Sequence, residues 1–330
     1  MHTWPGNSHQ RMIFSSRSVR GCFPRIQWAV VGWLLLFLVH SAPGILPPPR
    51  TGNLYVTSFG TDSVAVYDST GAYLRSFSAP GLDGPRGIVF APNNRIYIAG
   101  QHSDQIFVFD RNEQLITTFG HMQLDGPTGM AVEDTLLYVC SFNNDQVVVF
   151  NLEGTFLRTF TGGGLNGPNC VAFDSHGNIY VSSAMTATVV KFAPDETHRI
   201  TFTGGGLSSP MGIARDTADV LYVAGGGSNN IVMFDTLGNT LGTITHADLG
   251  GPQGIAFDDR GHFFTSSFFQ DHLVEFDGSG NYVQTITAGN LDMPRSLAFE
   301  PLEPPTGLGQ PVGIPHAVEL YPNFPNPFNP

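Results

Sequence analysis

The feature that most constrains this 330-residue chain is a repeat of about 42 residues. Each unit begins with a proline after a short turn, and successive prolines lie 42, 41, 42, 42 and 42 residues apart. The six prolines are Pro85, Pro127, Pro168, Pro210, Pro252 and Pro294. A fixed period of this length is typical of repeat architectures, in which each unit buries its apolar face against its neighbours.

Each unit contains four short runs of alternating apolar residues, bounded by Gly, Asn and Asp, which indicates four β-strands. In the unit that starts at Pro85 the expected strands are residues 87–91, 95–99, 105–110 and 114–120. Six such units predict an all-β fold, a six-bladed β-propeller of four-stranded antiparallel blades over residues 52–300.

The ends of the repeat region predict how the ring closes. The first unit lacks an inner strand, whereas an inner-strand pattern without a blade of its own follows Pro294. We therefore expect residues 297–300 to pair with residues 53–57, so that the C-terminal strand completes the first blade. This pairing would remove the open sheet edges.

Two sets of acidic and amide residues recur at fixed repeat positions and are predicted to hold turns. Asx residues two positions before the first apolar residue of the third strand are predicted to cap loops; they are Asp62, Asp104, Asp145, Asn229 and Asp271. Aspartates three residues before a glycine are predicted to accept hydrogen bonds within turns; they are Asp68, Asp174, Asp235, Asp258 and Asp277.

The charge balance excludes one class of partner. The formal net charge is −12, and only 13% of the residues are charged. Lys191 is the single lysine. Since nucleic-acid binding needs many cationic side chains to neutralise phosphates, we expect no nucleic-acid partner.

The first 44 residues differ from the repeats and are predicted to be a signal peptide. They contain arginines, then the short apolar run AVVGWLLLFLV (29–39), then small residues near Ala42. The apolar run is too short to span a bilayer comfortably, so no stable membrane span is expected after cleavage. Residues 45–51 would form a short linker, and the protein would be secreted or displayed on the cell surface.

Two cysteines follow the leader. Cys140 and Cys170 lie within apolar runs, where a small buried thiol is the commoner explanation, so no catalytic thiol is predicted. An exported protein can form a disulfide, and whether these two cysteines pair stays open at this point.

The repeats resemble those of the NHL family. The resemblance lies in segments such as GIAFDDRGHFF (254–264) and CVAFDSHGNIYV (170–181), and it covers residues 52–300. It implies a six-bladed propeller, and it implies little about activity because one fold supports many functions.

The end of the chain has a different composition. Residues 301–318 are rich in proline and are predicted to form an extended linker. Residues 319–330, ELYPNFPNPFNP, resemble the start of the C-terminal sorting domain of type IX secretion and of the FlgD-like immunoglobulin domain. This resemblance implies export from a Gram-negative bacterium, with the sorting domain truncated.

The repeat register predicts which side chains surround one end of the central channel. Two rings are expected, one just after each proline and one just after each second strand. From them we select a candidate ligand site with no catalytic residue and no metal: Arg86, Arg295, Phe59, Phe268, Gln101, Asn169 and Gln253. Arginines flanked by aromatic rings suit a carboxylate, an acidic sugar or a peptide terminus. The alternative is that the arginines pair with Asp83 and Asp292 and that the phenylalanines pack between blades.

Histidines on the same face are a weaker candidate. His102, His121, His246 and His272 fall in loops of different blades, and solvated side chains are expected rather than metal ligands.

Two functions remain open on the sequence. The favoured one is a non-catalytic binding or scaffold module, expected to be monomeric, for an extracellular glycan, peptide or protein, with no cofactor. The alternative is an enzyme similar to propeller lactonases or lyases, which implies a divalent metal, Ca or Zn, near the channel.

Overall fold

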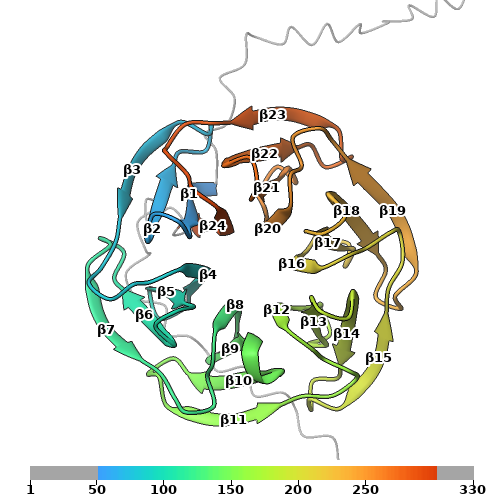
Figure 1. The fold of residues 1–330 in the computed structure, drawn as a ribbon, viewed down its shortest axis with the longest axis horizontal. Coiled ribbons are helices and arrows are strands. Elements are labelled where there is room, and N and C mark those ends of the chain that lie inside the picture. Colours follow the sequence, from blue (N-terminus) through green and yellow to red (C-terminus); the bar gives the residue numbers. More distant parts are fainter. Residues whose placement is uncertain (1–50, 303–330) are drawn as a thin grey trace, which may run out of the picture. The chain divides into compact units, whose positions relative to one another are not determined.

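The computed structural model describes residues 51–302, and these build six four-stranded antiparallel sheets around a central channel (Figure 1). The predicted all-β, six-bladed propeller is therefore confirmed. The sole helix within the described range is a single 3-10 turn at Phe142–Asn144, and no helix there could cross a membrane. The signal peptide, most of both linkers and the sorting segment predicted from the sequence lie outside the described residues.

The strands of each blade are given from the channel outwards. Blade 1 comprises β24 (Pro294–Pro301), β1 (Thr51–Ser58), β2 (Ser63–Tyr67) and β3 (Tyr73–Phe77). Blade 2 comprises β4 (Pro85–Ala91), β5 (Arg95–Gly100), β6 (Gln105–Phe109) and β7 (Leu115–Phe119). Blade 3 comprises β8 (Pro127–Glu133), β9 (Leu136–Ser141), β10 (Gln146–Asn151) and β11 (Phe156–Phe160). Blade 4 comprises β12 (Pro168–Phe173), β13 (Ile179–Ser183), β14 (Thr188–Phe192) and β15 (His198–Phe202). Blade 5 comprises β16 (Pro210–Arg215), β17 (Leu221–Gly225), β18 (Asn230–Phe234) and β19 (Thr240–Thr245). Blade 6 comprises β20 (Pro252–Phe257), β21 (Phe263–Ser267), β22 (His272–Phe276) and β23 (Tyr282–Ile286).

The ring closes through blade 1, as expected. β24 pairs with β1 in antiparallel register, with Leu54 opposite Phe299 and Val56 opposite Leu297. The ladder is longer than predicted, because Thr51 also pairs with Pro301 and Ser58 with Pro294, and the propeller extends one residue beyond the predicted range 52–300 at each end. Thr51 and Pro301 therefore belong to the propeller and not to the linkers.

The core lies between blades, where alternate strand residues face the next sheet. Between blades 1 and 2, for example, Tyr55 and Val64 pack with Ile88 and Phe107. The aromatic rings meet edge to face, as Tyr55 and Phe90 do with their centroids 5.1 Å apart, an arrangement that adds to simple burial. Each blade thus depends on its neighbours for burial of its apolar surface.

The Asx residues hold the turns as predicted. Asp62 accepts a hydrogen bond from the amide of Gly84 at 2.8 Å, and so ties the loop after β1 to the loop that enters β4. Asp104, Asp145, Asn229 and Asp271 do the same in their blades. This repeated bond places the loops around the channel in nearly the same way in five of the six blades, and blade 4 has Ala187 at this position.

Inner strands approach most closely at the second residue after each proline, which is glycine in four blades. A methyl group on Gly87 would overlap the carbonyl oxygen of Thr128 in the next blade and would lie 3.2 Å from the Cα of Gly129. Blades 4 and 1 carry Cys170 and Ser296 at this position.

We expect Gly87→Ala to lower the free energy of unfolding by about 1–3 kcal/mol, the usual cost of overpacking. The melting temperature should then fall by roughly 2–4 °C per kcal/mol. Differential scanning calorimetry measures this, with Ser296→Ala as the control because that position already has a Cβ. Equal melting temperatures for wild type and Gly87→Ala would contradict the close approach.

Candidate ligand-binding site at the central channel

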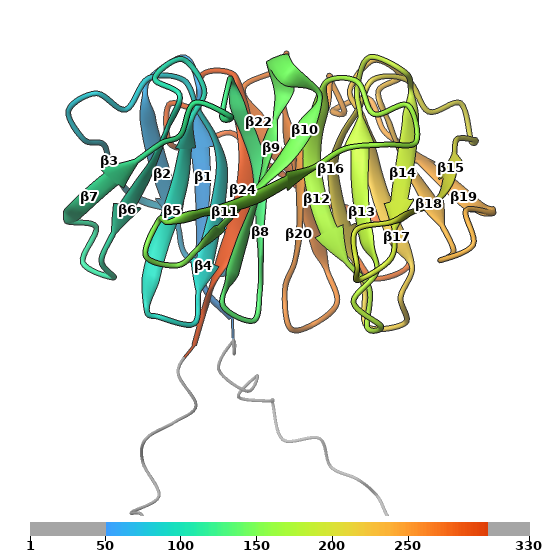
Figure 2. The same ribbon diagram turned by 90° about the horizontal axis from the view of Figure 1, so that it is seen from below.

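One end of the channel collects side chains from the starts of the inner strands. β4, β8, β12, β16, β20 and β24 surround the axis and run in the same direction along it (Figures 1 and 2). We call the end where they begin the channel face. A cavity of about 40 Å³ there is lined by Arg86, Gly129, Asn169, Cys170, Gly212, Ile213, Gln253, Gly254, Ile255, Arg295 and Ser296.

Arg295, the second residue of β24, is fixed by two rings and one amide. Its guanidinium carbon lies 4.0 Å from the ring centre of Phe268 and 4.7 Å from that of Phe59. Its Nη1 donates to Oε1 of Gln253 at 3.1 Å. The aromatic faces stabilise the cation and restrict the side chain to one direction.

Arg86, the second residue of β4, occupies the matching place in blade 2. It is buried, and its Nη1 donates to Oε1 of Gln101 at 3.2 Å. The ring of Phe142 lies 6.0 Å from its guanidinium carbon. The predicted residues Phe59, Phe268, Gln101 and Gln253 thus surround the two arginines, while Asn169 lines the same cavity from blade 4.

Hydroxyl groups of the preceding blade hold the backbone of both arginines. The hydroxyl of Thr57 in β1 donates to the carbonyl of Arg86 at 2.7 Å, and that of Ser266 in β21 donates to the carbonyl of Arg295. Because each bond crosses a blade boundary, the separation of the two arginines is set by the packing of the ring.

Neither arginine has an acidic partner in the described part of the chain, so the expectation that they pair with Asp83 and Asp292 is wrong. The Asp83 carboxylate instead contacts Nδ1 of His102 at 3.0 Å. Burial, with the charge of Arg295 beside it, lowers the pKa of Arg86 to about 9. Burial also lowers the pKa of Arg295 to about 10. Both side chains remain mostly protonated at neutral pH, and the fold holds two positive charges where an anion would stabilise them.

Two buried donors in this region lack a hydrogen-bond partner, namely Nε of Arg295 and Nδ2 of Asn169. Only 8% of Asn169 is exposed. An unpaired buried donor costs free energy, so a ligand with acceptor oxygens would be favoured there.

The four histidines considered from the sequence bind local groups and do not converge. His121 stacks on Phe156 and His246 stacks on Tyr282, at centroid distances of 3.9 and 4.1 Å. His272 is buried, with its Nε2 3.0 Å from the carbonyl oxygen of Asp248, so the expectation of a solvated side chain is wrong for this residue.

The two cysteines are free thiols in the structure. Burial raises the pKa of both Cys140 and Cys170, which leaves them protonated and poorly nucleophilic.

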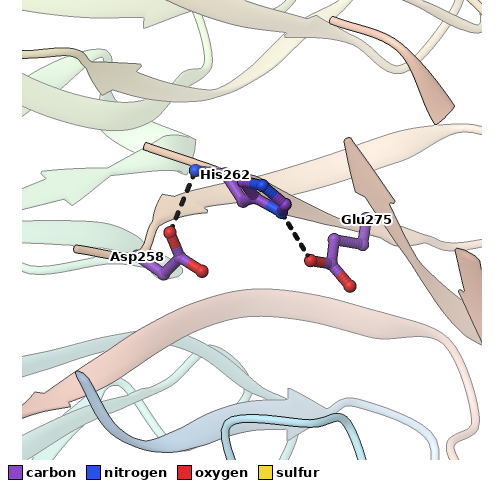
Figure 3. Close-up of side chains that lie close together, drawn as sticks. All are labelled: Asp258, His262 and Glu275. Carbon is purple, nitrogen blue, oxygen red and sulfur yellow. Dashed lines mark hydrogen bonds and ion pairs between the residues drawn. The ribbon is translucent and has the colours of Figure 1, made fainter. Parts of the chain in front are cut away.

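A second polar cluster lies at the other end of blade 6 and was missed from the sequence. Asp258 follows β20, His262 precedes β21, and Glu275 lies in β22; ligand-type atoms of all three lie within 4.8 Å of one another (Figure 3). The Glu275 carboxylate contacts Nδ1 of His262 at 2.8 Å. Arg260 contacts both carboxylates, with Nη2 at 2.6 Å from Asp258 and 3.2 Å from Glu275. A guanidinium thus already bridges this pair and offsets part of its charge.

The repeat register contained a signal for this cluster. Glu275 is the one acidic residue at its third-strand position, where the other blades carry Val66, Val108, Val149, Lys191 and Met233. In blade 4 the charge is reversed, since Nζ of Lys191 lies 3.8 Å from Oδ2 of Asp174, the counterpart of Asp258.

Sequence comparison matches residues 44–213 to the family described as lactonase, seven-bladed β-propeller. The chain belongs to this family. In the lactonase-family propeller described here, residues 51–302 build six blades and not seven. No curated protein matches its sequence.

Solved structures with the same fold include a chain of a protein complex and two lyases. A streptogramin B lyase has a TM-score of 0.60 at 12% identity, covering 76% of this chain and 88% of that one. A chain of a nidogen/laminin complex has a TM-score of 0.66 at 15% identity, covering 75% and 97%. A catalytically inactive virginiamycin B lyase from Staphylococcus aureus, solved with quinupristin, has a TM-score of 0.60 at 10% identity, covering 77% and 93%. At these identities the likeness concerns the fold alone.

Proposed function

We propose that this chain is an exported, non-catalytic recognition propeller whose channel face binds an extracellular glycan, peptide or protein through an anionic group. The observation that carries the proposal is the pair Arg86 and Arg295. Both line one small cavity, and neither has a carboxylate partner among the described residues. The NHL-like repeats support it, because they supply a regular scaffold that presents loops on one face.

The test is binding of the purified chain to glycan and peptide arrays. We expect the bound compounds to share a carboxylate or another anionic group, and Arg86→Ala and Arg295→Ala each to weaken binding at least tenfold, as loss of a charge-assisted hydrogen bond would. Arg199→Ala is the matched control, since Arg199 is exposed on the outer strand β15. Binding that survives both channel substitutions would remove the arginines from the proposal.

The lactonase family and the lyase fold favour a second candidate, a metal-dependent enzyme. The donor set at the channel does not fit it, because no Asp, Glu or His is among the described residues that line the cavity. Calcium and zinc sites need such oxygen or nitrogen ligands. Elemental analysis of the purified chain tests this candidate, and a stoichiometric divalent metal whose removal abolishes turnover would favour the enzyme over the recognition module.

A further inference from the structure

The cavity between the arginines has the size of a functional group and not of a whole ligand. Its volume of about 40 Å³ holds a few water molecules at most. A sugar ring or an amino-acid side chain is too large to enter, whereas the two oxygens of a carboxylate are not. The body of any ligand must therefore rest outside, on the rim of the channel face.

The donors inside the cavity exceed the acceptors. Arg86 and Arg295 each donate one hydrogen bond, to Gln101 and Gln253, although a guanidinium carries five N–H groups. The unpartnered Nδ2 of Asn169 adds a neutral donor from the opposite side of the channel. A carboxylate accepts several such bonds at once and offsets the charge of both arginines.

Aromatic rings lie beside both arginines, where the body of the ligand must lie. Phe59 and Phe268 flank Arg295, and Phe142 lies beside Arg86. Phe269, which contacts Phe268, is 72% exposed, and Met185 is 67% exposed. Exposed aromatic and methionine side chains grouped around a cavity are typical of a binding surface.

The charge of the rest of the chain limits the number of anionic groups on the ligand. The net charge is −12, so the overall field of the chain would repel a polymer with many carboxylates or sulfates. A single negative group avoids this repulsion.

From these four observations we infer that the channel face binds a monocarboxylate with an apolar body. Arg86, Arg295 and Asn169 hold the carboxylate, and the rings of Phe59 and Phe268 pack against the carbon skeleton. Such a ligand can be a free apolar carboxylic acid or the C-terminal carboxylate of a peptide that ends in an apolar residue. The inference rests on the proposed recognition function and narrows its ligand.

Isothermal titration calorimetry of the full chain at pH 7 tests the inference with four probes. These are 3-phenylpropionate, a tripeptide ending in phenylalanine, the same tripeptide with a C-terminal amide, and glucuronate. We expect the acid and the free tripeptide to bind, and the amide and glucuronate to bind at least tenfold more weakly. If 3-phenylpropionate and the free tripeptide bind with equal affinity, a small apolar acid is sufficient as the ligand. If the tripeptide binds tenfold more tightly, the site recognises the C-terminus of a peptide.

The variants separate binding from folding. Arg295→Gln keeps a polar side chain of similar reach but removes the charge, and it should weaken 3-phenylpropionate at least tenfold. Asn169→Leu should weaken it less, and Arg199→Ala should have no effect. The affinity of each variant is compared with that of the wild type only if the two proteins have the same melting temperature. If Arg295→Gln melts at a lower temperature, the affinity of Arg295→Lys is measured instead, because lysine retains the charge without the planar guanidinium.

The results that overturn the inference differ from those that overturn the proposed function. Amide binding equal to acid binding, or binding of glucuronate in place of the apolar acids, refutes the monocarboxylate while leaving a recognition module intact. Failure of all four probes together with blank glycan and peptide arrays refutes both.

Discussion

Deleting residues 295–300 is expected to abolish cooperative unfolding of the entire ring and not merely to weaken blade 1. These residues form most of β24, which supplies the inner strand of blade 1 and contacts the inner strands on both sides, β4 and β20. Leu297 lies in the cluster with Leu54, Val56 and Phe264, so its loss opens the boundary with blade 6 as well.

The size of this effect follows from burial. Each fully buried aliphatic or aromatic side chain contributes roughly 1.5–3 kcal/mol, and the deletion exposes several such side chains of β1, against a total stability of about 5–15 kcal/mol. Residues Leu54 and Val56 would also lose their backbone partners in the ladder. We therefore expect the sharp calorimetric transition of the wild type to disappear.

Two controls make the result specific. Truncation after residue 305 leaves β24 whole, since the strand ends at Pro301, and should change the melting temperature by less than a few degrees. Leu297→Ala should cost about 2–5 kcal/mol, whereas Leu302→Ala should cost almost nothing because Leu302 is 50% exposed. Equal melting curves for the deletion and the truncation would mean that the ring does not close through β24.

The second large effect is expected at the carboxylate pair of blade 6. Only 2% of the Asp258 side chain and 3% of the Glu275 side chain are exposed, and Arg260 bridges them. Arg260→Ala leaves two buried carboxylates without their guanidinium, with His262 and Gln284 as the remaining side-chain partners of Glu275. Removing one partner of a buried pair costs about 3–5 kcal/mol, and we expect about 1–3 kcal/mol here because the Arg260 side chain is 49% exposed to solvent.

Glu275→Val provides the matched test, because blades 1, 2 and 3 carry valine at the same position. Replacing a buried charged group by a packed apolar one is often neutral, so this single substitution should change stability by about 1 kcal/mol or less. In the double variant the cost of Arg260→Ala should fall by more than half. Urea titration of the four proteins gives the coupling energy, and purely additive effects would show that Arg260 does not act on Glu275.

Much of the fold follows from local sequence signals. The prolines mark each inner strand, and Asx-to-glycine turns such as Asp277 to Gly280 require a glycine at positive φ, which here is 80°. Closure of the ring could also be predicted. Residues 53–57 had no inner strand in their own repeat, and residues 297–300 formed an inner strand without a blade, so the two segments were expected to pair. The turns depend on interactions that are short in sequence, and the closure follows because the same four-strand unit is repeated six times and must be complete in each blade.

The candidate site could be predicted only as far as the repeat register reaches. The register placed Arg86 and Arg295 in adjacent blades at one end of the channel, as the structure has them. It also placed Phe59 and Phe268 beside the arginines, but it could not determine that both rings contact Arg295 or that Arg295 donates to Gln253, because those contacts depend on how blades 1 and 6 pack. The cluster of Asp258, His262 and Glu275 lies within one blade, and it depends on a third-strand side chain meeting the turn between the first two strands, which strand alternation alone does not specify.

The sequence by itself determined the number of blades, the strand order and the residues that surround the channel, because a repeated turn and an alternating strand specify geometry within one unit. Only the tertiary structure decided which charges are neutralised. Asp83 pairs with His102 and leaves the arginines free, while Arg260 bridges the two buried carboxylates of blade 6, Asp258 and Glu275. The physical reason is that burial and charge pairing depend on side chains from neighbouring strands and blades, whose directions are set only when the whole ring packs.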